Sequence, residues 1–258
     1  MRRVLALVAA AAVLLAANPA AAQAAPSVRP PAQRPQPVLR YEDLDPLVRP
    51  AVDRLRVALG EVARTDRELM PADGLGTLRA ADDAVLDQRA RARARVMAGL
   101  DELLAAGPRG RTAIRFLAAE WTGNDPVQRA EVRAAILAAD HGDALALVDR
   151  LALTAPRDTQ FLRWRADALD ALGRPADALR TRQARFELAP GDEAGWEALL
   201  RAHEANGSLP RLREHLARLR LVYPASAAIR EHEIEVLHRL GRRDEAARLA
   251  ADTTGRMR

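Results

Sequence analysis

Three segments that each end in glycine decide the fold: ADALDALG at residues 166–173, LLRAHEANG at 199–207 and EIEVLHRLG at 233–241. Their final glycines, Gly173, Gly207 and Gly241, are separated by 34 and 34 residues. Glycine just past a helix end readily adopts the left-handed backbone conformation that other residues resist. The three segments therefore predict three helices that stop at one repeating position.

A second set of residues keeps the same period. Pro156, Pro190 and Pro224 are also 34 and 34 residues apart. Proline cannot continue the hydrogen-bond ladder of a helix, so each one is expected to close a second helix. Two kinds of helix-breaking residue at one spacing predict a repeated pair of helices.

Between these marks the apolar residues recur at helical spacing. The three predicted stripes are Leu162, Ala166, Leu169 and Leu172; Trp196, Leu199, Leu200 and His203; and Ile234, Leu237 and Leu240. Ala178 and Ala246 each lie at the same short distance after a repeat glycine, where a small side chain lets the second helix approach the first.

The composition favours helices throughout the chain. Of 258 residues, 49% are hydrophobic but only 3% are aromatic, and the apolar residues are mainly Ala, Leu and Val. Ala and Leu are strong helix formers, whereas the aromatic and β-branched residues that favour sheets are few. The sequence predicts an all-α protein. The absence of cysteine excludes disulfides and thiolate metal sites.

The charge balance gives little support to nucleic-acid binding. The 40 basic residues are all arginine and face 35 acids, a net charge of +5. Loss of Arg2 and Arg3 with the N-terminal segment described below leaves 38 bases and 35 acids. So small an excess produces no strong positive field, and no nucleic-acid partner is expected.

Residues 159–252 resemble three tetratricopeptide repeats. The resemblance is carried by Trp196 with Leu199, the repeat glycines, the closing prolines, Ala178 and Ala246. Leu212 stands where the middle repeat should have a small residue, and Thr253-Thr254-Gly255 replaces the last proline. The resemblance implies a right-handed solenoid of antiparallel helix pairs.

One more, shortened pair is expected to precede these repeats, so that the solenoid spans residues 125–258. Asp125-Pro126 predicts a helix start, and the helix is expected to run to about Ala139. His141-Gly142-Asp143 is interpreted as the turn into a second helix that ends near Pro156.

Residues 41–124 do not show the period of the repeats and predict a separate helical region. A helix after Pro50 carries Leu55, Val57, Leu59 and Val62, a long helix is predicted over 78–106, and a third over 112–121. They are either eroded repeats or a cap over the open end of the solenoid.

Residues 1–24 have the three parts of a secretory signal peptide. Met1-Arg2-Arg3 is followed by fourteen apolar residues, Val4–Ala17, and then by small residues around Ala22 and Ala24. An uncleaved anchor is the alternative, but fourteen residues fall short of the roughly 20 that span a bilayer. Residues 25–40 are proline-rich and predict a linker. The mature protein is expected in the periplasm without a membrane span.

In the tetratricopeptide family the first helix of each pair lines a groove that holds extended or helical peptides. The resemblance places these residues in the groove: Gln160, Arg163, Asp167, Asp170, Glu197, Arg201, Glu204, Glu231, Glu235, His238 and Arg239. Six acids and three arginines give the set a charge of −3, which favours a basic or amine-bearing segment. The alternative is that they form the solvated face of amphipathic helices.

No catalytic pattern stands out, so a non-enzymatic binding or scaffolding protein without cofactor or metal is expected, with another envelope protein or peptide as its partner. The sequence contains no G-x-S-x-G, phosphate-loop, G-x-G-x-x-G or H-E-x-x-H motif. The five histidines are interpreted as surface or groove residues, and His232 and His238 should lie on opposite faces of one helix.

The alternative function is a structural accessory of peptidoglycan or outer-membrane assembly. It would contact polymer or lipid through the arginines that alternate with alanine at Arg89, Arg91, Arg93 and Arg95.

Overall fold

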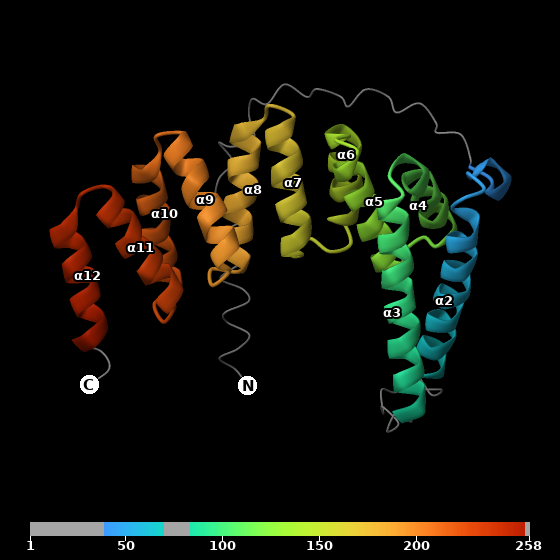
Figure 1. The fold of residues 1–258 in the computed structure, drawn as a ribbon. Coiled ribbons are helices and arrows are strands. Elements are labelled where there is room, and N and C mark those ends of the chain that lie inside the picture. The colour runs from blue at the N-terminus through green and yellow to red at the C-terminus, as the bar shows by residue number, and fades with distance from the viewer. Residues whose placement is uncertain (1–38, 70–82, 256–258) are drawn as a thin grey trace. The chain divides into compact units, whose positions relative to one another are not determined.

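The computed structural model describes residues 39–69 and 83–255, and in these ranges the chain is helical and contains no strand (Figure 1). The elements are η2 (Tyr41–Asp43), α2 (Arg49–Glu68), α3 (Asp83–Ala105), α4 (Pro108–Glu120), α5 (Asp125–Leu137), α6 (His141–Leu151), α7 (Thr159–Ala171), α8 (Pro175–Leu188), α9 (Glu193–Ala205), α10 (Leu209–Val222), α11 (Ala227–Arg239) and α12 (Arg243–Gly255). From α2 to α12, each helix packs against the next one along the chain. The predicted all-α helical solenoid is confirmed.

The N-terminal predictions fall largely outside this range. The signal peptide, nearly all of the proline-rich linker and the start of the predicted helix at 78–82 lie outside the described residues. None of the helices described is both long and apolar enough to cross a bilayer.

The helix pairs from α5 to α12 follow a single period, the one that the repeat glycines predict. The first helices begin at Asp125, Thr159, Glu193 and Ala227. The second helices begin at His141, Pro175, Leu209 and Arg243, always at the same interval after the first. The pair α5–α6 thus shares the register of the later three, and only its second helix is short. Asp125, which the sequence places at the helix start, is the first helical residue, and the side-chain oxygen of Asn124 caps the helix.

The turn between α5 and α6 corrects the sequence interpretation. His141-Gly142-Asp143 is predicted to form this turn, but all three residues lie inside α6. The residue one full period before Gly173 is Ala139, and its φ of 54° matches the 71°, 59° and 72° of the three repeat glycines. The backbone therefore keeps the left-handed turn although no glycine is available for it.

Replacing Ala139 by glycine is expected to raise the free energy of unfolding by about 1 kcal/mol, because a Cβ atom in the left-handed region costs roughly that much. Urea unfolding followed by circular dichroism measures the change. Ala138→Gly is the matched control, since Ala138 has a φ of −82° and gains nothing from glycine. No gain at position 139 would contradict the left-handed turn.

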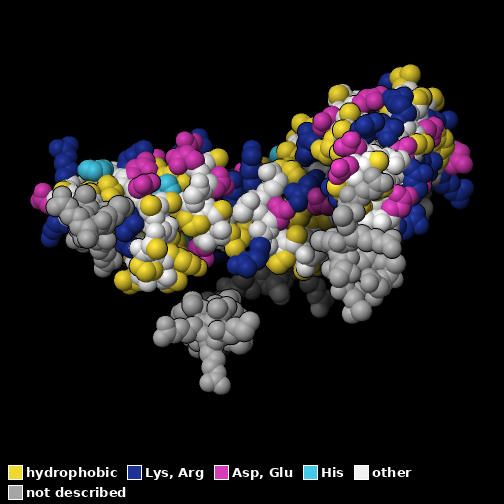
Figure 2. Space-filling view, turned by 90° about the horizontal axis from the view of Figure 1, so that it is seen from below, with side chains coloured by type: hydrophobic (Ala, Val, Ile, Leu, Met, Phe, Trp, Pro, Cys, Tyr) yellow, Lys and Arg dark blue, Asp and Glu magenta, His cyan; other side chains and the backbone are white. Residues whose placement is uncertain are grey.

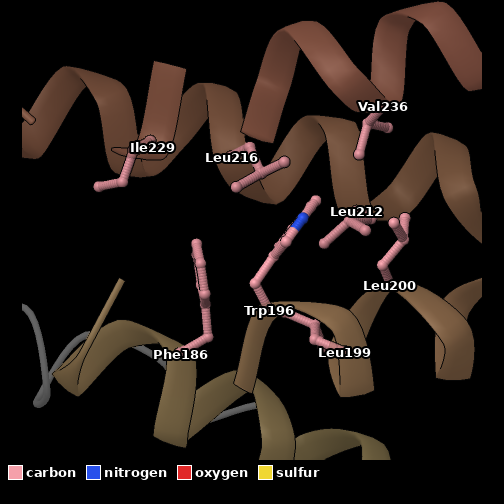
Figure 3. Packing of buried hydrophobic residues seen from close by; sticks show 8 residues of the cluster. All are labelled: Phe186, Trp196, Leu199, Leu200, Leu212, Leu216, Ile229 and Val236. Atoms are coloured by element: carbon pink, nitrogen blue, oxygen red, sulfur yellow. The ribbon is translucent and has the colours of Figure 1, made fainter. Parts of the chain in front are cut away.

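The core lies between the two helices of each pair and between successive pairs. The four residues at one second-helix position, Ala144, Ala178, Leu212 and Ala246, are all fully buried. A buried cluster joins α8, α9, α10 and α11 around Trp196 (Figure 3). A second cluster joins α5, α6 and α7 around Phe161. The small residues predicted at Ala178 and Ala246 therefore do lie at helix contacts, and Leu212 occupies the same place.

The N-terminal helices pack on the repeats. Helices α3 and α4 both contact α5, and Arg111 of α4 lies 2.7 Å from Asp140 and 2.9 Å from Asp143. Helix α4 begins at Pro108 and α6 at His141, an interval close to the repeat period. Within α2 the predicted apolar set is only partly internal, because Val57 is 62% exposed.

Candidate functional site

The eleven predicted groove residues lie on the three first helices α7, α9 and α11. Nine of them are exposed, and Gln160 and Glu235 are half-buried. Their accessibility fits either a binding face or an ordinary solvated face, so it is the arrangement of the residues that distinguishes the two.

A hollow between α7, α8 and α9 brings three of the predicted residues together. It has a volume of about 440 Å³ and is bordered by Asp167 and Asp170 of α7 and Arg201 of α9. Small side chains of α9 line it between these charges: Ala198, Ala202 and Ala205. A partner side chain can therefore enter between α7 and α9 and meet charges of both signs.

The hollow also contains a residue that the sequence analysis missed. Arg182 belongs to the second helix α8, yet its guanidinium forms ion pairs with Asp170 and, at 3.8 Å, with Asp167. Its side chain is only 14% exposed. The predicted charge of −3 counted first helices only, and Arg182 offsets one of those acids. Asp167 remains 56% exposed and is the more accessible carboxylate.

Further along the chain, one ion pair and one hydrogen bond join α9 to α11. Arg239 of α11 forms an ion pair with Glu204 of α9 and lies 3.3 Å from Glu235 of its own helix. Glu235 also accepts a hydrogen bond of 2.8 Å from the indole Nε1 of Trp196. These three charged residues hold the helices together, so part of the predicted binding set is structural.

The remaining predicted residues are not brought into the hollow. Arg163 lies 3.9 Å from Asp167, and Glu197 lies 3.6 Å from Arg201, each pair within one helix. Glu231 and His238 are exposed and form no ion pair with any residue that the structure describes. Over the face shown in Figure 2, acidic and basic side chains are interspersed.

Three of the five histidines are less exposed than predicted. His203 and His232 are 1% and 7% exposed, and the side chain of His215 is 14% exposed. Burial lowers the pKa of His203 and of His215. His238 is exposed, so it lies opposite His232 as expected. Within residues 39–69 and 83–255 no cluster of three His, Asp or Glu residues could hold a metal ion.

The arginine-rich helix α3 is largely paired with acids. Arg89 and Arg95 form ion pairs with Asp66 and Glu61 of α2, and Arg91 lies 3.8 Å from Asp87. These carboxylates offset the positive charge that contact with an anionic polymer or lipid would require. A hollow of about 760 Å³ lined by Arg91 and Arg95 lies on this helix, but the ion pairs reduce the free positive charge that it offers.

No family model matches this sequence, and a comparison with curated proteins finds none that is similar to it.

Proposed function

We propose that this protein is a tetratricopeptide-type repeat protein that binds a segment of a partner protein on the face of α7, α9 and α11 and does not catalyse a reaction. The observation that carries the proposal is the hollow lined by Asp167 and Asp170 of α7 together with Arg201 and small side chains of α9. The hollow gives a partner side chain room to enter between α7 and α9, next to charges of both signs.

The repeat type is supported by the period of the helices. The successive pairs from α5 to α12 keep one constant spacing of both helix starts. Each pair has a residue of positive φ after its first helix and a fully buried residue early in its second. Such helix pairs cannot bury their apolar faces alone, so they stack and present their first helices along one surface.

The chemistry of the hollow defines the class of partner segment. Asp167 is the accessible carboxylate, since Arg182 lies closest to Asp170. We propose that an arginine, lysine or terminal amine of the partner pairs with Asp167, while a short apolar side chain covers the alanines. Exposed pairs are worth only about 0.2–1 kcal/mol, so several repeats must contribute to a stable complex.

The site of action is proposed to be the periplasm, on the strength of the signal-like residues 1–24. Partners are then proteins or peptides of the bacterial envelope. Cell fractionation followed by mass spectrometry of the N-terminus tests this, and recovery from the cytoplasmic fraction with an intact Met1 would contradict it.

A photo-crosslinking residue at Ala205, which lines the hollow, is expected to capture a discrete envelope protein in living cells. The same residue at Ala184, exposed on α8 and outside the hollow, is the matched control and should capture little.

Asp167→Arg is expected to lower the Ala205 yield at least about fivefold, because it places like charge against a basic segment. Charge reversal at Glu197 and Glu231 should lower it further if the segment extends along all three helices. Arg91→Ala with Arg95→Ala should leave it unchanged. If the crosslinking yield did not respond to the changes of acidic residues but was lost on replacing Arg91 and Arg95, the partner would contact α3 instead.

A further inference from the structure

A single histidine interrupts an otherwise apolar position of the repeat. His203 lies in α9 and is 1% exposed. Its counterparts at the same position of the other pairs are Ala135, Leu169 and Leu237, all of them buried. Only this repeat therefore places a group that can take up a proton at that point of the core.

The hydrogen bonds of His203 suit its neutral form. Nδ1 lies 2.9 Å from the hydroxyl oxygen and 3.2 Å from the carbonyl oxygen of Ser208. A carbonyl can only accept, so Nδ1 carries the hydrogen, and Nε2 is free to accept from the Gln183 amide nitrogen of α8 at 3.3 Å. A proton at Nε2 would place a second N–H donor opposite the N–H donor of the Gln183 amide. The amide would then have to rotate so that its oxygen faces the histidine.

The surroundings offer the imidazolium no counter-charge. Helix α8 presents the neutral Gln183 to His203, and α10 presents a second histidine, His215. The charged groups nearest His215 are Arg218 of α10 and Glu187 of α8, whose carboxylate lies 3.3 Å from His215 Nε2. Burial raises the pKa of Glu187, so this carboxylate itself takes up protons in acid. No carboxylate contacts His203 in the part of the chain that the structure describes.

We propose that His203 makes the contact of α9 with α8 and α10 a proton-sensitive joint, which loosens on acidification before the rest of the solenoid does. Proton uptake breaks the hydrogen bond from Gln183 and places a positive charge in an apolar layer. That charge also lies close to His215. The joint is closed when His203 is neutral and opens when a proton is bound.

The direction with pH follows from the lowered pKa. The ordinary value for histidine is 6.5, and burial holds the pKa of His203 below it. Above that value neither the folded nor the unfolded chain is protonated at His203, and the joint has its full stability. As the pH falls below 6.5, the unfolded chain takes up the proton at His203 before the folded chain does. The free energy of unfolding therefore decreases until the pH is below the pKa of His203 in the folded chain. Each unit by which the pKa is lowered weakens the folding equilibrium about tenfold at the acid end.

The joint borders the proposed binding face. Helix α9 turns His203 inward and carries Arg201 and Ala202 on the wall of the hollow. Loosening α9 should therefore also release a partner in acid, a consequence that rests on the proposed function.

The joint itself is tested on the protein alone, by the NMR titration of its histidine ring protons and by amide hydrogen exchange under neutral and mildly acidic conditions. The wild type is expected to show a His203 pKa below the ordinary histidine value and amide protection that falls selectively in α9 and α10 in acid. His203→Leu, which places here the residue found at positions 169 and 237, should lose clearly less protection in acid than the wild type, because only His215 is then left to take up a proton in this contact. The exposed His238→Gln is the matched control and should behave as the wild type.

The proposed joint would be overturned by an ordinary His203 pKa. It would also be overturned if acid lowered amide protection in α9 and α10 equally in the wild type and in His203→Leu. The titration decides this even if the leucine variant folds poorly. Crosslinking from Ala205 under both conditions then separates the two proposals. Failure of crosslinking at neutral pH counts against the binding face alone. If crosslinking succeeds at neutral pH and its yield falls equally in acid for the wild type and His203→Leu, the result counts against the joint alone.

Discussion

Replacing Trp196 by alanine is expected to lower the free energy of unfolding by about 3–5 kcal/mol, the range for deleting a large aromatic side chain from a core. The indole is 1% exposed and lies in the middle of the cluster shown in Figure 3. It stacks on His232 with ring centres 4.1 Å apart and lies 5.6 Å from Phe186. The helices α8, α9 and α11 therefore lose a common contact when it is removed.

Urea unfolding followed by far-UV circular dichroism measures this loss. The transition is also expected to broaden, because repeat arrays lose cooperativity when one interface between neighbouring units fails. Leu221→Ala is the matched control, since Leu221 is 77% exposed and its truncation should stay within about 0.5 kcal/mol. Trp196→Phe keeps an aromatic ring in the core but removes the hydrogen bond to Glu235. It should lower the free energy of unfolding less than Trp196→Ala does. A loss below about 1 kcal/mol in the alanine variant would contradict the central position of Trp196.

The repeating helices could be predicted from the sequence because particular backbone positions demand particular residues. A left-handed residue after each first helix is most easily glycine, so Gly173, Gly207 and Gly241 mark the period directly. Ala139 fills the same position without that signature, and a search for glycine points to Gly142 instead. The available signal was the period itself, counted back from Gly173 to Ala139.

The candidate site was only partly predictable. The acids that line the hollow lie on the first helix α7, but long arginine side chains reach beyond the helix that bears them. Arg182 reaches from α8 to the carboxylates of α7, and helix faces alone cannot show this. For His203 the signal was present, because it continues the apolar stripe of Trp196, Leu199 and Leu200. A position in such a stripe is a better guide to burial than residue type.

The second large effect is expected at Gly110, in the first turn of α4, where no sequence pattern indicates a close contact. A Cβ atom built there would lie 1.6 Å from the carbonyl oxygen of Leu103 and 2.6 Å from its carbonyl carbon. Both are backbone atoms of α3, so no side chain can rotate to make room. Gly110→Ala must therefore push α4 away from α3, at an expected cost of about 3 kcal/mol or more, at or above the upper end of overpacking effects.

The displacement would also strain the ion pairs of Arg111, the next residue, with Asp140 and Asp143, and so reach the first repeat. Gly60→Ala is the matched control, because Gly60 lies inside α2 with no atom within 4 Å of its built Cβ. Removing a helical glycine there should raise the free energy of unfolding by about 0.5–1 kcal/mol. Thermal and urea unfolding of the two variants should thus shift in opposite directions. If both gained stability, helix propensity would outweigh sterics at position 110, and α3 and α4 could not be in backbone contact.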